Sequence, residues 1–274
     1  KEWKLVDHIA KPQQFEEMVK ARAAELAKLS DRPGGQGVAL TPLKRDADEA
    51  GYRYTHVEVA LDRAARTATL TVTAPMGRQP DELEEILTQG ARWWPLAMAR
   101  ELDDAILMLR TNDLDVGLWQ IKTRGDLAAV LEADATMAKF KDNWFVRETI
   151  GMLRRCLRRL DVSSRSMFAV LDEGSCFGGL FFELALAADR SFMLKIEDDF
   201  ARAPKVALSA ANFGLYPMNN GLSRLATRFA NEAAPVDAAR AMLGKTLEAD
   251  QVAELGLVTF TPVELDWDEE LRIA

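Results

Sequence analysis

The sequence predicts an α/β fold, in which helices cover a sheet. Predicted strands and helices alternate along the chain, and this order is typical of that class. Hydrophobic residues make up 48% of the 274 positions, which is enough to build a large core. No apolar run approaches the roughly 18 residues that a membrane span needs. We therefore expect one large domain, or two small ones, with no membrane partner.

Composition argues against several kinds of function. The formal net charge is −8 and no stretch concentrates lysine and arginine, so nucleic acid is not an expected partner. Cys156 and Cys176 provide no disulfide framework, and the first residues do not resemble a signal peptide, which together favour the cytoplasm. His8 and His56 share no helix face with each other or with a cysteine. We therefore expect no structural zinc site, and a carboxylate for any acid–base chemistry.

The two ends of the chain show a weak internal repeat. Near the start, a predicted strand over residues 5–9 leads through Pro12 into an amphipathic helix over residues 15–29. Near the other end, a predicted strand over residues 256–260 leads through a proline into a final helical run. The repeat indicates two structural units in succession, although the order strand, proline, helix is common enough to arise without one.

This repeat predicts three parts of the chain. Residues 1–30 would be the tail of a preceding unit, leaving its last helix at the start of this chain. Residues 31–51 are rich in glycine, proline and charge, as a linker would be. Residues 52–274 would form a second unit that is truncated at its C-terminal end.

The predicted elements of this second unit follow from hydrophobic periodicity. In chain order they are strands over residues 52–61 and 67–72, a helix over 96–109, a strand over 116–121, a helix over 144–160 and a strand over 166–171.

The segment GSCFGGLFFELALAAD, residues 174–189, carries the strongest chemical signal in the chain. It predicts a helix that is apolar nearly all round except for Glu183. Burial would raise the pKa of this carboxylate, which suits proton transfer, whereas a structural role near the helix start is equally compatible with the pattern. Cys176 precedes the helix, where a thiolate could be stabilised, but a small buried hydrophobic residue is the favoured interpretation.

The glycine pair Gly178-Gly179 stands where this helix begins. Free backbone N–H groups and a partial positive charge at a helix start can bind a thioester oxygen, and glycine lets an acyl group approach the backbone. Two such donors aimed at one oxygen form an oxyanion hole. Close helix–strand packing is the alternative reason for the two glycines.

Four segments in order resemble the crotonase (enoyl-CoA hydratase/isomerase) superfamily. They are LEAD at 131–134, EGSCFGGLFFELALAAD at 173–189, FGLYPMNNGLSRL at 213–225 and LGLVTFTP at 255–262. The resemblance implies a spiral of ββα units that binds acyl-CoA. By matching motif, the backbone N–H groups of Ala133 and Gly179 would form the oxyanion hole, and Glu183 would be a catalytic carboxylate.

The chain departs from the superfamily pattern at three places. Glu132 stands where the pattern has glycine, so it is either a new acid–base group beside the oxyanion hole or a solvated turn residue. One extra residue precedes Glu183, which predicts a different direction for its side chain. Ala210 replaces the second catalytic glutamate of the hydratases, so their two-glutamate addition of water is not expected of this unit alone.

Longer runs, such as DNWFVRETIGMLRR and DVSSRSMFAVLDEGSCFGG, resemble one branch of the superfamily. These are the ring-opening 2,3-epoxybenzoyl-CoA dihydrolases, also called benzoyl-CoA-dihydrodiol lyases, which join two crotonase-like units. The resemblance implies a lyase of aerobic benzoate breakdown that opens an epoxidised benzoyl-CoA ring to an unsaturated adipyl-CoA semialdehyde and formate. It implies CoA as part of the substrate, no separate cofactor or metal, and a homo-oligomer.

Within such an enzyme, this half would be a degenerate unit that supports a catalytic preceding unit. Two alternatives stay open: an active acyl-CoA hydratase- or isomerase-type unit that uses Glu183, or a structural module that never binds CoA. Four basic residues are candidate contacts for the CoA phosphates: Lys122, Arg124, Lys139 and Lys141.

Overall fold

The structure is a computed structural model that describes residues 2–30 and 37–274. The chain divides into two compact units, Lys1–Ala39 and Leu40–Ala274, which are described separately. In the part of the chain that the structure describes, no helix is long and apolar enough to cross a membrane.

The first unit contains helix α1 (Pro12–Ala27), which begins at a proline, as helices often do. It agrees with the predicted helix within a few residues. The strand predicted over residues 5–9 is wrong, because this segment forms bends and irregular coil. A strand needs a neighbour to satisfy its backbone groups, and short apolar runs do not by themselves supply one.

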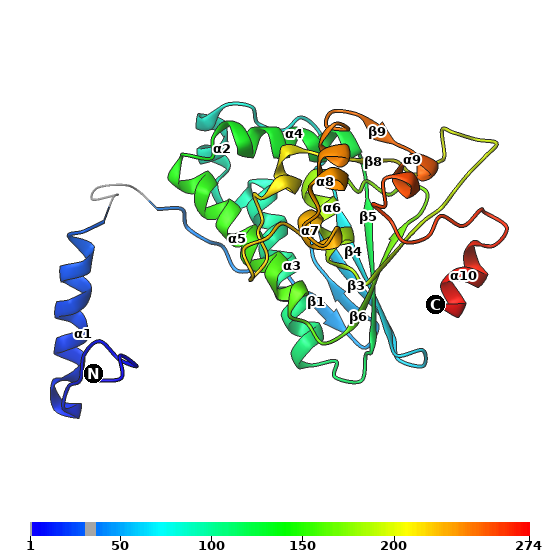
Figure 1. The fold of residues 1–274 in the computed structure, drawn as a ribbon. Helices are drawn as coiled ribbons and strands as arrows, with labels where there is room; N and C mark the ends of the chain where they lie inside the picture. The colour runs from blue at the N-terminus through cyan, green and yellow to red at the C-terminus, as the bar shows by residue number, and fades with distance from the viewer. Residues whose placement is uncertain (1, 31–36) are drawn as a thin grey trace. The chain divides into compact units, whose positions relative to one another are not determined.

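The second unit is built on a seven-stranded sheet whose strands follow chain order from β1 to β7 (Figure 1). The first four strands pair antiparallel, and β4 to β7 pair parallel. The strands are β1 (Asp46–Asp48), β2 (Gly51–Arg53), β3 (Val57–Asp62), β4 (Thr67–Thr73), β5 (Leu118–Arg124), β6 (Ser166–Leu171) and β7 (Arg190–Met193), with a separate pair β8 (Val206–Ala207) and β9 (Thr246–Leu247).

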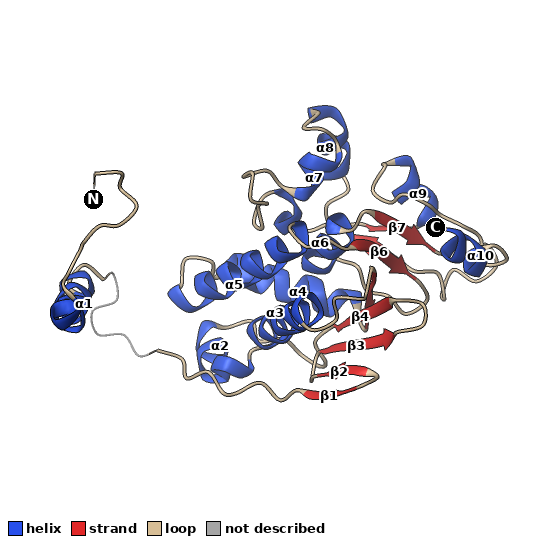
Figure 2. Ribbon diagram, turned by 90° about the horizontal axis from the view of Figure 1, so that it is seen from below, coloured by secondary structure: helices blue, strands red, loops and turns tan. Residues whose placement is uncertain are grey.

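Helices connect and cover these strands, and Figure 2 shows α2 to α6 grouped beside the sheet. They are α2 (Leu83–Gln89), α3 (Trp94–Thr111), α4 (Leu127–Lys139), α5 (Trp144–Asp161), α6 (Gly179–Ala187), α7 (Arg224–Arg228), α8 (Ala233–Arg240), α9 (Ala249–Glu254) and α10 (Trp267–Ile273), with 3₁₀ turns η1 (Gly90–Arg92) and η2 (Ala210–Phe213). The predicted α/β class is therefore confirmed.

Most predicted elements of this unit form within a few residues of their expected bounds. The strand over residues 166–171 has the predicted limits because its apolar run is buried on both faces, as in a parallel sheet. The strand predicted over residues 256–260 is wrong, since among the described residues this segment pairs with β7 through a single bridge, between Phe260 and Phe192. Residues 46–51, expected within the linker, already belong to the β1–β2 hairpin.

Helix α4 was not predicted, and it decides how the site is built. Asp126 caps it by accepting a hydrogen bond from the Ala128 N–H at 2.9 Å. Residues 131–134, expected at a turn, therefore lie inside a helix.

Candidate functional site

The candidate site lies at the amino end of helix α6, whose residues Gly179 to Leu186 are all buried. Gly178 is extended, with φ of −126°. Gly179 has φ of +45°, a backbone conformation that residues other than glycine rarely adopt. The chain can therefore turn sharply from the loop into a helix that is surrounded by protein.

The carboxylate of Asp134, from α4, occupies the position in front of this helix start. Its Oδ2 accepts hydrogen bonds from the Leu180 N–H at 2.9 Å and from the Ser209 hydroxyl at 2.7 Å. A Cβ atom on Gly179 would lie 1.9 Å from that same oxygen. The glycine is thus required by the close approach of Asp134, and the anion at the helix start is part of the protein.

The second oxygen of Asp134 is in a different situation. Oδ1 is buried and has no hydrogen-bond partner among the described residues, and the whole residue is only 4% exposed. Burial raises the pKa of Asp134 to about 7, and the bonds from Ser209 and Leu180 oppose that rise. A buried acceptor without a donor is costly, so this oxygen is the least satisfied atom of the site.

A cavity of about 670 Å³ opens beside Asp134. Its walls come from α4, from the segment around η2 and from the turn before β9, and they are mostly apolar. The lining residues are Leu131, Asp134, Ala135, Ala138, Lys141, Leu208, Ser209, Ala210, Ala211, Gly214, Leu215, Leu243 and Gly244. Ala210 leaves its part of the wall without the carboxylate that the hydratase pattern places there.

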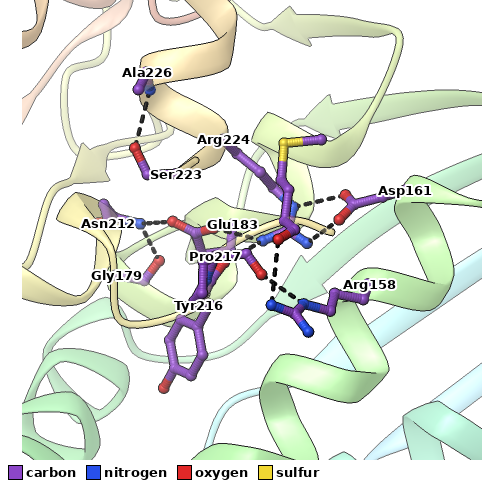
Figure 3. A network of polar contacts seen from close by, with 11 residues as sticks. Arg158, Asp161, Gly179, Glu183, Asn212, Tyr216, Pro217, Ser223, Arg224 and Ala226 are labelled. Atoms are coloured by element: carbon purple, nitrogen blue, oxygen red, sulfur yellow. Dashed lines mark hydrogen bonds and ion pairs between the residues drawn. The ribbon is translucent and has the colours of Figure 1, made fainter. Parts of the chain in front are cut away.

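Glu183, in helix α6, lies in a buried polar network with Asn212 and Arg224 (Figure 3). Its Oε1 accepts a hydrogen bond from Asn212 Nδ2 at 2.8 Å, and its Oε2 accepts one from Arg224 Nη1 at 2.9 Å. The residue is 1% exposed and is not among the described residues that line the cavity.

Arg224 links Glu183 to a second carboxylate. It donates to both oxygens of Asp161 at 2.9 and 2.7 Å and to the carbonyl oxygen of Tyr216 at 3.0 Å. Burial raises the pKa of Glu183 to about 7, against the opposing effects of Arg224 and Asn212. Burial also raises the pKa of Asp161, with Arg224 opposing it. Two carboxylates share one buried guanidinium, which is a structural ion-pair network.

A capping box connects the two carboxylate sites. Ser209 and Asn212 cap η2 reciprocally, and their remaining donors reach outward. Ser209 donates to Asp134, whereas Asn212 donates to Glu183 and to the Gly179 carbonyl oxygen at 2.9 Å. The segment that carries Ala210 is therefore fixed at both ends.

The structure does not assemble the predicted oxyanion hole. Ala133 lies in the interior of α4, where backbone N–H groups donate to carbonyls four residues earlier, so the expectation that it supplies a donor is wrong. Glu132 is exposed on the same helix, so the solvated alternative describes it and the acid–base alternative does not. The motif match placed residues 131–134 at a turn, but in the structure they form part of helix α4.

The other candidates also have structural partners. A Cβ atom on Gly178 would lie 2.4 Å from Leu127, which supports close packing for this glycine. Cys176 is buried, and burial raises the pKa of its thiol to about 11, so a thiolate is disfavoured. Among the phosphate candidates, Lys122 and Arg124 both pair with Asp172 and Lys139 contacts Asp81 and Glu82, while Lys141 lines the cavity.

The sequence did not indicate that three residues belong to the site: Asp134, Asn212 and Asp161. Asp134 belongs to the LEAD segment, yet nothing in the sequence shows that its carboxylate reaches a helix start 46 residues further along. Asp161 carried no signal because its role depends on Arg224, and Asn212 carried none because it reaches Glu183 and Gly179 only in the folded chain.

Comparison with solved structures identifies the fold. No protein-family model matches the chain. An enoyl-CoA hydratase from Geobacillus kaustophilus is similar in structure, with a TM-score of 0.50 and 17% identity over 80% of this chain and 73% of that one. An enoyl-CoA hydratase from Bacillus anthracis gives a TM-score of 0.51 and 15% identity over 80% and 74% of the two chains. The chain has the crotonase fold.

A curated relative gives a closer match. The chain is 57% identical over 276 aligned residues to the benzoyl-CoA-dihydrodiol lyase of Aromatoleum evansii. The alignment covers 100% of this chain and 49% of that protein, so the chain spans about half the length of the relative. The predicted similarity to this lyase is confirmed, and the structural similarity to enoyl-CoA hydratases confirms the predicted crotonase-like fold.

Proposed function

We propose that this chain is the supporting unit of a ring-opening lyase that acts on 2,3-epoxybenzoyl-CoA. The reaction takes up water, opens the ring and releases an unsaturated adipyl-CoA semialdehyde and formate. The identity of 57% to a benzoyl-CoA-dihydrodiol lyase supports this assignment, and the span of about half of that protein fits one of two units.

The observation that carries the supporting role is the carboxylate of Asp134 at the start of α6. A thioester oxygen that gains negative charge needs donors there, and the Leu180 N–H already bonds to Asp134 Oδ2 at 2.9 Å. An enolate placed at this helix start would lie beside the Asp134 carboxylate, which repels negative charge. Such an arrangement disfavours the transition state of acyl-CoA chemistry.

The acid–base groups lead to the same conclusion. Both oxygens of Glu183 are engaged, by Asn212 and Arg224, and Ala210 has no carboxylate. A general acid or base must reach the reacting atom within hydrogen-bond distance, directly or through one water. In this proposal the paired glutamates and the working oxyanion hole belong to the preceding unit, which this chain stabilises.

The remaining features of the proposal concern location and partners. CoA enters as part of the substrate and no further cofactor takes part. The lyase works in the cytoplasm as a homo-oligomer, and the preceding crotonase-like unit is the nearest partner of this chain.

The test is Glu183→Gln in a polypeptide that joins this chain to its preceding unit. We expect turnover of epoxidised benzoyl-CoA within about twofold of the parent, because the amide keeps the shape and its carbonyl oxygen still accepts from Arg224. The exposed change Glu132→Gln is the matched control. A loss of about 100-fold or more, the usual effect of removing a catalytic acid or base, in a variant that circular dichroism shows to be folded at the assay temperature, would assign catalysis to Glu183 and overturn the proposal.

A second measurement separates the supporting role from the active-unit alternative. Isothermal titration of the isolated chain with benzoyl-CoA should show no saturable binding up to millimolar concentration. Saturable binding that Gly179→Pro abolishes would instead indicate a working thioester site in this unit.

A further inference from the structure

Three arginines line one pocket at the edge of the sheet where the parallel strands begin. Arg66 immediately precedes β4, Arg165 immediately precedes β6, and Arg190 is the first residue of β7. The pocket has a volume of about 660 Å³, which is within the usual range for small ligands. Helix α6 follows the carboxyl end of β6 in the chain, so this pocket belongs to the opposite end of the strands from the candidate site.

The strand register brings two of these arginines to either side of a glycine. The first residues of β4, β5 and β6 are paired with one another, so the residues just before them, Arg66, Gly117 and Arg165, form the next row. The Gly117 N–H donates to the Arg66 carbonyl at 2.9 Å, which extends the ladder to this row. A Cβ atom on Gly117 would meet no heavy atom within 4 Å. Open space therefore separates two arginines whose backbones are about 10 Å apart, twice the usual strand spacing.

The three guanidinium groups form no ion pair among the described residues, and backbone carbonyls hold them instead. The bonds run from Arg66 Nε to Asp115 at 2.8 Å, from Arg165 to Ser164 at 2.8 Å and Leu114 at 3.5 Å, and from Arg190 Nη1 to Ala274 at 3.2 Å. Arg190 also lies over the ring of Phe168, another lining residue, 5.7 Å from its centre. Both Nη groups of Arg66, and Nε and Nη2 of Arg190, keep donors without a partner in the described part of the chain.

We propose that this pocket binds a small oxyanion with at least two negative charges, of the diphosphate type. Guanidinium groups bind phosphate oxygens through paired N–H donors. Two linked phosphoryl groups offer oxygens in several directions, so one ligand engages arginines that come from different strands. This goes beyond the supporting role proposed above, since the ligand is not the acyl group on which the lyase acts.

The charge of the lining favours such an anion. One carboxylate, Asp189, opposes it; its Oδ2 accepts a hydrogen bond from the Met167 N–H at 2.8 Å. Three cations face this single carboxylate, in a chain whose formal net charge is −8. The local field therefore attracts a multiply charged anion more strongly than a singly charged one.

Isothermal titration of this chain with inorganic pyrophosphate, in metal-free buffer at pH 8 and fixed ionic strength, tests the proposal. We expect saturable binding with a Kd below about 1 mM, and binding of acetate that is about tenfold weaker or more. No saturable binding of pyrophosphate at millimolar concentration, or equal affinity for acetate, would overturn the proposal.

Two variants and a control locate the ligand. Arg190→Gln should weaken pyrophosphate binding about fivefold or more, whereas Arg155→Gln, at an exposed arginine outside the pocket, should leave it unchanged. Equal losses in these two variants would indicate attraction to surface charge alone and refute the assignment.

Gly117→Leu fills the space between Arg66 and Arg165. Gly117 does not have a positive φ and its Cβ position is open, so leucine fits the backbone and the far-UV circular dichroism should stay unchanged. Pyrophosphate binding should be lost. Retained binding would place the anion elsewhere and refute the assignment.

Arg66 provides a readout that a purely structural role would not give. It has φ of +57°, a conformation that favours glycine, at the end of the turn between β3 and β4. Arg66→Gly should therefore weaken pyrophosphate binding about fivefold or more while the urea midpoint stays the same or rises. Unchanged binding in this variant would exclude Arg66 from the site and contradict the proposed pairing across Gly117.

The outcomes are independent of the lyase proposal. Loss of turnover in Glu183→Gln would refute the supporting role without affecting pyrophosphate binding. Conversely, failure of pyrophosphate to bind would leave the turnover experiment unchanged.

Discussion

Two buried carboxylates lie at helix α6, Glu183 on the helix itself and Asp134 from α4 at its start, and they differ in how their charge is compensated. Glu183 has a donor on each oxygen, including the guanidinium of Arg224, which also pairs with Asp161. Asp134 has two donors on one oxygen and none, among the described residues, on the other. The first site is therefore a completed structural network, whereas the second leaves one buried carboxylate oxygen without a hydrogen bond from the described residues. Asp134, the carboxylate whose hydrogen bonding is incomplete, is therefore the stronger candidate for a functional role.

The largest expected effect comes from removing the shared cation of the completed network. Arg224→Met leaves Glu183 and Asp161 buried without their partner, which typically costs about 3–5 kcal/mol in unfolding free energy. Chemical denaturation at pH 8 measures the loss, with the exposed Arg155→Met on α5 as control.

A second variant set tests the cause of that loss. Adding Glu183→Gln and Asp161→Asn to Arg224→Met should recover a substantial part of the stability, since neutral amides are cheaper to bury than unpaired carboxylates. A cost below about 1 kcal/mol for Arg224→Met alone would show that the network contributes little, and the contrast with Asp134 would lose its basis.

The next largest effect is expected at Gly179, where Asp134 closely approaches the start of helix α6. Gly179→Ala adds a Cβ atom 1.9 Å from Asp134 Oδ2 and forces alanine to φ of +45°, so we expect a loss of roughly 2–4 kcal/mol. Gly151→Ala is the matched control, because it lies in helix α5 with no heavy atom within 4 Å and should be neutral or slightly stabilising.

A double-mutant cycle assigns the cost to Asp134. In an Asp134→Ala background the closest colliding oxygen is absent, so Gly179→Ala should cost about 1 kcal/mol or somewhat more, from backbone strain and from the remaining contact with Ser209 Oγ at 2.9 Å. An undiminished cost in that background would mean that the carboxylate does not determine the need for glycine.

Sequence reasoning predicted the fold and the importance of α6, but not the division of roles between its carboxylates. The α/β class followed from periodicity, and the strand over residues 166–171 followed from its apolar run because burial on both faces leaves a clear pattern. Asp134 could not be assigned, since its role depends on α4, a helix whose limits were hidden by a motif match to residues 131–134. Likewise, the direction of Glu183 depends on Arg224 and Asn212, which reach it from 41 and 29 residues away.

The smallest effect, and the one that distinguishes the two carboxylates most directly, is the pH dependence of stability. Burial raises the pKa of Asp134 from 3.8 to about 7, so between these values the folded state binds more protons than the unfolded state. The unfolding free energy associated with this group is therefore highest below pH 4 and falls as the pH rises to 7. Asp134→Asn cannot titrate, and its stability relative to the parent should rise over that interval by a few kcal/mol at most.

Urea unfolding at several pH values from 4.5 to 8 measures this difference, with Glu183→Gln as the matched comparison. The pKa of Glu183 is also raised to about 7, from 4.5. Replacing Glu183 should therefore also reduce the fall in unfolding free energy as the pH rises. Glu183→Gln also weakens an ion pair with Arg224, so its variant should lose stability at pH 8, where Asp134→Asn should not. If Asp134→Asn instead loses stability at pH 8, its carboxylate is as fully compensated as that of Glu183, and the two sites are equivalent.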